Sequence, residues 1–321
     1  MLRAVGLCRA ATDLAARGAA VEAGVAAGAR VDVSDRNKEA WPCDLLEEPT
    51  DWLAARNAFP RDADIVFFEG PHIYEIRGLA AALSVTGLCG APFPHKFDKH
   101  EAIANMKPTT RADRYPDMTD SEIFEAWETN RNEASRLGTK MHAAIEVFWN
   151  THKVSKDPEI APEMGQFLQF YHAEMVARNI VPYRTEPTVF ADGLPTPVPG
   201  KPELGMLPGS VDFLGVDDKG VFWVLDWKRT NKLTTEGYNR FGTPPFEELA
   251  DCNVSKYSLQ LHLYRQIFQL HYGIAIPEEN LYMVTFHVKE PTYKMVQAKP
   301  VAHLAKRLLD QFDVWGALAI A

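Results

Sequence analysis

Alternating apolar and polar side chains predict a β-hairpin at residues 209–230, GSVDFLGVDDKGVFWVLDWKRT. Successive side chains of a strand point to opposite faces, so the second half of this stretch presents two different faces. One face carries Val221, Trp223, Leu225 and Trp227, and the other carries Phe222, Val224, Asp226 and Lys228. The pattern therefore places Asp226 and Lys228 side by side.

The expected turn fixes the register of this hairpin. We expect a three-residue turn with Gly220 in the left-handed conformation, closed by Asp217 opposite Val221. In that register Asp212 lies directly opposite Asp226. Two carboxylates this close repel unless a divalent cation lies between them, and hard oxygen ligands suit magnesium or manganese. The alternative is an exposed hairpin with solvated charges.

A helix is predicted around GTKMHAAIE, residues 138–146. Thr139, which follows Gly138, is the expected N-cap. Helical spacing then forms an apolar stripe from Met141, Ile145 and Phe148. His142 and Glu146 lie four residues apart on a neighbouring stripe, where the imidazole could give one nitrogen to a cation or serve as a hydrogen-bonded core histidine.

A second helix is predicted around YSLQLHLYRQIF, with Gln260 and Tyr264 on one face. Its other face carries Leu259, Leu263 and Ile267. Two strands near 281–288 and 292–296 and a helix at 302–318 close the chain. Residues 231–255 contain few periodic apolar side chains and predict a long loop bordering a substrate groove. Tyr238 and Phe241 in this loop could stack on bases or pack on their own domain.

Composition and charge add limits to this picture. The chain has 321 residues, 46% of them hydrophobic and 24% charged, which is ordinary for a globular protein. No stretch reaches the roughly 18 apolar residues of a membrane span, so we expect a soluble intracellular protein without a membrane partner. The net charge of −9 does not exclude nucleic acid, because cations and a local basic stripe can attract a phosphate backbone. The candidate nucleic-acid contacts are Arg136, Lys140, Arg229, Lys232 and Arg240.

The cysteines and the first residues carry little chemistry. Cys8, Cys43, Cys89 and Cys252 are scattered and predict reduced thiols rather than a disulfide framework. Residues 1–60 are alanine-rich and contain none of the motifs, which predicts a helical N-terminal extension to a domain at residues 61–321. An organellar targeting segment is the alternative, although acidic residues interrupt it and serine is scarce.

Taken in order, these motifs resemble the PD-(D/E)XK nuclease superfamily, and specifically its RecB-like exonuclease branch. That branch includes the CRISPR adaptation nucleases and the mitochondrial genome maintenance exonuclease. Residues 138–146 are similar to its G-x-x-x-H-x-x-x-E helix, and Gln260 and Tyr264 to its Q-x-x-x-Y helix. Glu186 in YRTEPTVF is similar to the acidic residue on the strand preceding the hairpin. The resemblance covers roughly residues 65–297.

The resemblance implies an α/β fold with a PD-(D/E)XK restriction-endonuclease-like core, a central mixed sheet flanked by the two helices. It implies that His142, Asp212, Asp226 and the Trp227 backbone carbonyl hold one or two Mg²⁺ or Mn²⁺ ions. Glu146 would hold a water of a second metal or orient a ligand. Gln260 and Tyr264 would position the scissile phosphate or the lysine, and Glu186 would assist them. Lys228 would orient the attacking water or stabilise developing negative charge.

The implied activity is a metal-dependent DNA exonuclease with 5′-phosphate and 3′-hydroxyl products, preferring single-stranded ends. We expect no iron-sulfur cluster, because the branch members that hold one use three closely spaced C-terminal cysteines and this chain has none after Cys252. A structure-specific endonuclease of the same superfamily is one alternative. A catalytically silent DNA-binding protein is the other, and cleavage of linear against closed-circular DNA separates the three.

Overall fold

The computed structural model describes residues 51–68, 72–95, 97–196 and 200–320. Most of the predicted N-terminal extension, together with Cys8 and Cys43, therefore lies outside the described residues. Within that extension the structure describes one short helix, α2 (Trp52–Arg56). Cys89 and Cys252 are free and buried, as reduced structural thiols should be.

The central sheet has five strands in the order β10-β9-β8-β7-β4. They are β4 (Val181–Thr185), β7 (Phe213–Val216), β8 (Phe222–Arg229), β9 (Leu281–Phe286) and β10 (Lys294–Gln297). β8 and β9 run parallel while the other neighbours run antiparallel, so the predicted mixed sheet is confirmed. Two smaller sheets consist of β1 (Ile65–Phe68), β2 (Ile73–Ile76) and β3 (Leu79–Ala80), and of β5 (Thr188–Ala191) and β6 (Leu207–Ser210).

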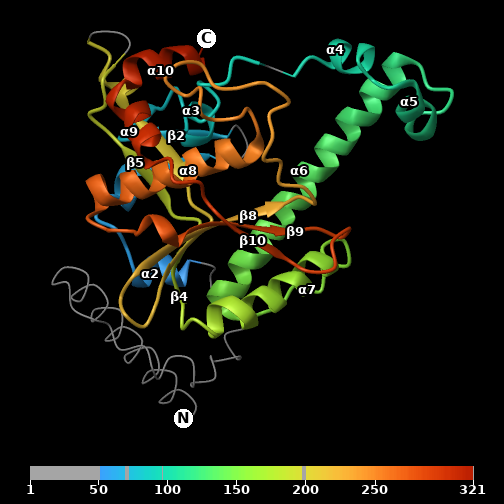
Figure 1. Cartoon of the computed structure of the whole chain (residues 1–321). Helices are drawn as coiled ribbons and strands as arrows, with labels where there is room; N and C mark the ends of the chain where they lie inside the picture. Colours follow the sequence, from blue (N-terminus) through green and yellow to red (C-terminus); the bar gives the residue numbers. More distant parts are fainter. Residues whose placement is uncertain (1–50, 69–71, 96, 197–199, 321) are drawn as a thin grey trace.

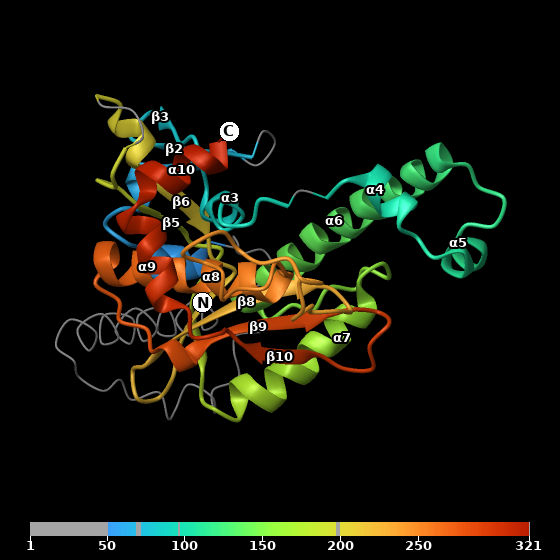
Figure 2. The ribbon, with the colours of Figure 1, turned by 45° about the horizontal axis from the view of Figure 1, so that its top comes forward.

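Helices cover both faces of the central sheet (Figures 1 and 2). Leu225 and Trp227 pack toward α6 (Asp120–Thr151) and α7 (Ala161–Phe170). Phe222 and Val224, on the other face of β8, pack toward α8 (Asn253–Ile267) and α9 (Ala302–Asp310). The alternation in the sequence thus separates two hydrophobic cores, and the α/β fold class is confirmed.

The register of the β7–β8 hairpin is the one that the sequence predicts. Phe213 pairs with Leu225 and Val216 with Phe222, so the next pair in this register is Asp212 and Asp226. The Asp217 amide donates to the Val221 carbonyl at 3.0 Å. Gly220 takes a φ of +78°, a left-handed conformation that glycine adopts at no steric cost.

The start of the His142 helix was predicted wrongly. α6 begins at Asp120, and its N-cap is Thr119 rather than Thr139. Thr119 and Glu122 form a capping box, in which the Thr119 amide donates to Glu122 Oε2 at 2.7 Å. The helix continues through Gly138, and α4 (Lys99–Ala104) and α5 (Pro108–Arg114) lie beside its first turns. We call residues 97–127 the arm, which stands away from the body in Figures 1 and 2.

The C-terminal part of the chain follows the predicted order with one correction. The expected helix at 302–318 is two helices, α9 and α10 (Phe312–Ile320), because the backbone leaves helical geometry at Gln311. The predicted long loop is confirmed. From Asn231 to Cys252 the chain forms no helix or strand beyond one isolated bridge between Phe241 and Ala250. Among the residues the structure describes, no helix is long and apolar enough to cross a membrane.

Candidate metal centre

Two long antiparallel segments bring Glu186 and Asp212 together. The pairing of Thr185 with Phe213 at the end of β4 and of Thr188 with Ser210 at the start of β5 belongs to one continuous register. Glu186 and Asp212 face each other between these pairs, and the Glu186 amide donates to the Asp212 carbonyl at 3.2 Å. Glu186 therefore lies just after β4 instead of on the strand, with a left-handed φ of +45°.

Asp212 also contacts the neighbouring strand β8. Its Oδ2 accepts a hydrogen bond from the Trp227 amide at 2.5 Å. One residue earlier, Asp226 is only 3% exposed. Its Oδ1 accepts from Gln260 Nε2 at 3.2 Å, and its Oδ2 lies 2.7 Å from Lys228 Nζ. Three adjacent segments thus contribute three neighbouring carboxylates.

His142 reaches this group from α6. Its Nδ1 lies 3.4 Å from Glu186 Oε1 and 3.7 Å from Asp212 Oδ1. Its Nε2 lies 3.1 Å from the Trp227 carbonyl oxygen. Ligand atoms of His142, Glu186 and Asp212 all lie within 4.8 Å of one another, so these three residues could hold a metal ion. We call them the metal cluster.

The electrostatics of the metal cluster reflect crowding of like charges. Burial and the neighbouring carboxylates of Asp226 and Glu186 raise the pKa of Asp212 to about 7. Burial alone would lower the pKa of His142, but Asp212 and Glu186 outweigh burial and raise that pKa to about 9. Burial would raise the pKa of Glu186, yet its contact with His142 prevails and lowers that pKa. A divalent cation would relieve this repulsion, and one imidazole nitrogen with carboxylate oxygens is a donor set that such a cation accepts.

We expect the affinity of the metal cluster for Mn²⁺ to rise as the pH is raised from about 6 to about 9. Ligands must be deprotonated, and the raised pKa values of Asp212 and His142 mean that protons occupy the cluster at neutral pH. The cation must displace these protons. The affinity for Mn²⁺ is therefore lower at low pH, where more of the ligands are protonated. Isothermal titration calorimetry in buffers of different ionisation enthalpy measures both affinity and proton release. An affinity that is independent of pH, with no proton released, would contradict this expectation.

Lys228 and Gln260 lie where the sequence places them, on the same side as Asp226. Burial would lower the pKa of Lys228, but Asp226 and Asp212 outweigh it and raise that pKa, which keeps the ammonium charged. The Lys228 Nζ also lies 4.8 Å from the centre of the Tyr257 ring. Tyr257 was not predicted, although its place three residues before Gln260 puts both on one helix face.

Three further residues complete the comparison. Ser210, for which the sequence gives no signal, donates its hydroxyl to Glu186 Oε2 at 3.0 Å. Tyr264 is only 2% exposed and packs on Gly209, where an added Cβ would lie 2.7 Å from the Tyr264 ring. Tyr264 is therefore part of the hydrophobic core next to the site. Glu146 does not belong to the metal cluster.

Two of the predicted nucleic-acid contacts are occupied by surface ion pairs. Arg136 pairs with Glu133 at 2.8 Å and with Glu159 at 2.6 Å. Lys140 pairs with Asp157 at 2.7 Å and also with Glu159. These partners neutralise both cations, so neither is presented to a phosphate in this arrangement.

Arg229 has a structural role in place of the predicted one. Its guanidinium lies 2.9 Å from Glu163 Oε1, and Glu163 is fully buried. Arg240 lies 3.4 Å from Glu101 on α4. Lys232 is exposed on the loop. Only Lys232 among the five predicted contacts therefore lacks an acidic partner in the described part of the chain.

We expect Arg229→Met to lower the free energy of unfolding by about 3–5 kcal/mol, because it leaves the Glu163 carboxylate buried without its partner. Lys232→Met is the matched control on the same stretch of chain, where an exposed substitution changes stability by about 0.5 kcal/mol or less. Urea unfolding followed by tryptophan fluorescence measures both. Equal midpoints for the two variants would show that the Arg229–Glu163 pair does not stabilise the fold.

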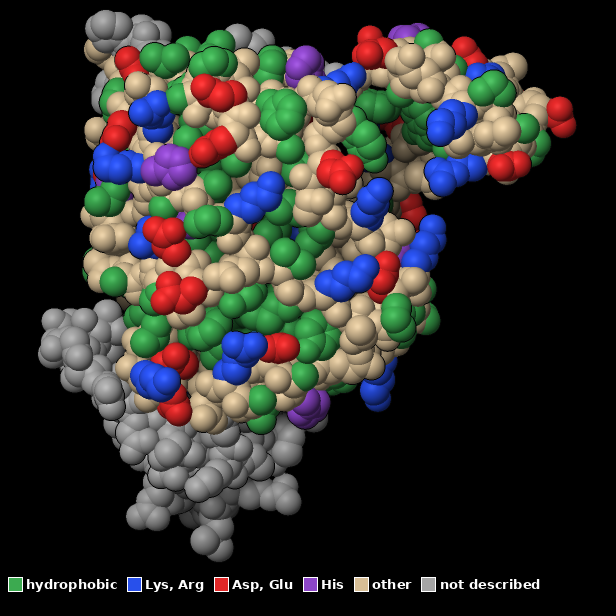
Figure 3. Space-filling view, viewed as in Figure 1, with side chains coloured by type: hydrophobic (Ala, Val, Ile, Leu, Met, Phe, Trp, Pro, Cys, Tyr) green, Lys and Arg blue, Asp and Glu red, His purple; other side chains and the backbone are tan. Residues whose placement is uncertain are grey.

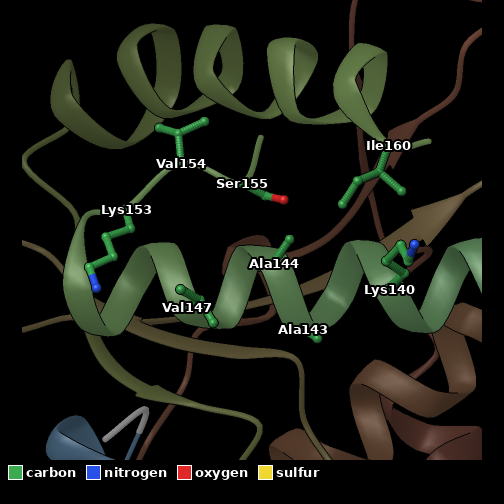
Figure 4. Close-up of a pocket in the computed structure, with 8 residues that line it drawn as sticks. All are labelled: Lys140, Ala143, Ala144, Val147, Lys153, Val154, Ser155 and Ile160. Atoms are coloured by element: carbon green, nitrogen blue, oxygen red, sulfur yellow. The ribbon is translucent and has the colours of Figure 1, made fainter. Parts of the chain in front are cut away.

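A cavity of about 400 Å³ lies apart from the metal cluster (Figure 4). It lies between α6 and the segment that leads to α7. Its lining residues are Lys140, Ala143, Ala144, Val147, Lys153, Val154, Ser155 and Ile160. No member of the metal cluster lines it, so the candidate chemistry lies at the sheet and not in this cavity.

Comparisons with known proteins add little. No protein-family model matches this sequence, and no curated protein matches it. The structure is similar to the crystal structure of SSO0001, over 56% of this chain and 71% of that chain, with 13% sequence identity and a TM-score of 0.25. A similarity this low carries no argument, so the chemistry rests on the residues of the chain itself.

Proposed function

We propose that this chain is a divalent-metal-dependent DNA exonuclease of the PD-(D/E)XK superfamily, in its RecB-like branch. One observation carries the proposal: His142, Glu186 and Asp212 converge on one point beside the Asp226–Lys228 pair. Crowded carboxylates that are buried or half-buried destabilise a protein that does not use them. Their presence next to the half-buried Lys228 favours catalysis over a silent binding role.

In this proposal the metal cluster holds one or two magnesium or manganese ions, and Asp226 and the Trp227 carbonyl are further ligands. A bound divalent cation supplies a more acidic water molecule and positive charge at the phosphate. Lys228 adds a second positive charge, which stabilises the negative charge that develops on the phosphate oxygens. Gln260 orients the Asp226 carboxylate through its hydrogen bond. The products would carry a 5′-phosphate and a 3′-hydroxyl.

The surroundings of the site support entry by a free end. The loop 231–252 continues directly from β8, and α6 carries His142 on the other side of the site. The Thr243 amide and hydroxyl donate to the Pro92 carbonyl at 2.8 and 3.2 Å, which ties the loop to the segment leading to the arm. In this proposal a strand reaches the metal cluster by passing between these elements, and a single-stranded end is narrow enough to do so.

The test is digestion of end-labelled linear and covalently closed circular single-stranded DNA with Mg²⁺. We expect linear strands to shorten progressively, circles to survive, and excess chelator to stop the reaction. A variant with residues 235–250 shortened should begin to cut circles. Rapid nicking of circles by the intact protein would overturn the exonuclease proposal in favour of an endonuclease. Binding without any cleavage would favour the silent DNA-binding protein.

A further inference from the structure

Three aromatic side chains are left exposed on two segments that touch each other. Tyr238 is 78% exposed, Phe97 is 75% exposed and Phe241 is 49% exposed, which makes them the most exposed aromatic residues in the described ranges. Phe97 lies at the base of α4, while Tyr238 and Phe241 lie in the loop 231–252. An exposed aromatic ring does not contribute the free energy of folding that its burial would give. Three such rings on adjoining segments therefore indicate a binding surface.

An ion pair joins the two segments that carry these rings. Arg240, which lies between Tyr238 and Phe241, contacts Glu101 at 3.4 Å, four residues after Phe97. At about 3.8 Å between successive Cα atoms, the Phe97 backbone lies within about 15 Å of Glu101, and that of Tyr238 within about 8 Å of Arg240. Several consecutive nucleotides of a single strand would cover this span.

The backbone holds Tyr238 outward in an uncommon conformation. Tyr238 and Asn239 have successive positive φ angles of 49° and 64°. The turn is closed by the Arg240 amide, which donates to the Gly237 carbonyl at 2.9 Å. Left-handed pairs of this kind favour glycine, asparagine or aspartate, and a bulky ring there is strained. Strain of this kind clusters at functional sites.

The Phe97 ring is supported from one side and open on the other. Its centre lies 5.9 Å from that of Trp127 on α6, and Trp127 Nε1 in turn donates to the Tyr115 hydroxyl at 2.7 Å. Figure 3 shows that the arm projects from the body with hydrophobic and charged side chains mixed on its surface. The two rings are tilted by 60° and Phe97 stays 75% exposed, so most of its ring surface is open to a flat partner.

We propose that Phe97, Tyr238 and Phe241 form a stacking surface for unpaired nucleobases, on which a single strand is held before its end reaches the metal cluster. Base stacking on aromatic rings tolerates any sequence, because every base has a π face. Local charges nearly balance, since Lys99 and Arg240 lie beside Asp98 and Glu101. Binding at this surface therefore depends on stacking of the bases more than on contacts to the phosphates. The identification of the ligand as a nucleic-acid strand rests on the proposed function.

The test is the affinity for a fluorescein-labelled oligothymidylate, measured by anisotropy with Ca²⁺ in place of Mg²⁺. Replacing all three rings by alanine should weaken binding on the order of 1,000-fold, at roughly tenfold for each ring. The fold-change should be the same at low and high salt, because few counterions are involved. An oligonucleotide of abasic residues, which keeps the phosphates, should bind the wild type and the triple variant alike. Three tryptophans at these positions should restore affinity for oligothymidylate.

The matched control replaces three exposed aliphatic residues that lie outside both segments, Val176, Leu270 and Val288, by alanine. It should leave affinity unchanged. Wild-type affinity in the aromatic triple variant, or an equal loss on the abasic strand, would overturn the inference. Hydrolysis of bis(p-nitrophenyl) phosphate, which is too small to span the surface, reports on the metal cluster alone. Absence of that hydrolysis with the stacking pattern intact would reject the nuclease proposal and leave the stacking surface standing.

Discussion

Asp212→Asn is expected to abolish detectable DNA cleavage and to weaken Mn²⁺ binding by more than about 100-fold, the upper range for losing a residue that only orients a metal ligand. Asparagine keeps the volume and can still accept the Trp227 amide hydrogen bond, so the fold is retained. What it removes is the charge at the centre of the metal cluster. Calorimetric titration with Mn²⁺ and digestion of end-labelled DNA measure the two effects separately.

Glu236→Gln is the control for this substitution, since it removes a carboxylate that is exposed on the loop. It should bind Mn²⁺ and cleave DNA as the wild type does. Retained cleavage in Asp212→Asn, or cleavage by the wild type in excess chelator, would reject a metal site at this position. Equal melting temperatures of the two variants exclude unfolding as the cause of any loss.

Lys228→Ala is expected to lower the rate of cleavage on the order of 100-fold or more while DNA and Mn²⁺ still bind, because one charge at the developing phosphate is lost. The lysine is held between Asp226 and Tyr257, so its ammonium has a fixed position. Single-turnover cleavage at saturating protein separates the chemical step from binding. Lys219→Ala, in the exposed hairpin turn, is the control and should cleave normally.

Removing Lys228 also leaves Asp226 without its ionic partner, so stability must be followed in the same samples. Urea midpoints establish whether the variant is folded at the assay temperature. Weaker DNA binding with an unchanged single-turnover rate would make Lys228 an anchor for phosphate. That outcome would contradict a role in the chemical step.

Local chemistry made the β7–β8 hairpin predictable from the sequence. A single glycine suited to the left-handed region fixes the turn length, and side-chain alternation then fixes which residues meet across the strands. Both depend on residues that lie close together along the chain. The turn length and the alternation together place Asp226 beside Lys228 and opposite Asp212. Gln260 joins them because its helix packs on the face of β8 that carries Asp226.

The position of Glu186 could not be derived in this way. Its pairing with Asp212 depends on two segments far apart in the chain and on a register shift between Pro182 and Arg184. One extra residue in a strand moves every later side chain to the opposite face, and nothing in the local sequence marks that bulge. The start of α6 was missed for a related reason, since residues 128–136 are all exposed and lack an apolar stripe.

That exposed stretch joins the arm to the metal cluster mechanically. His142 lies about 33 Å from the N-terminal end of α6, at about 1.5 Å per residue of a continuous helix. A tilt of about 5° pivoting at the imidazole would carry the far end through roughly 3 Å. α6 is therefore a lever with its long end in the arm. A displacement of the arm would therefore reach the metal cluster through His142, and bending of residues 128–136 would reduce it.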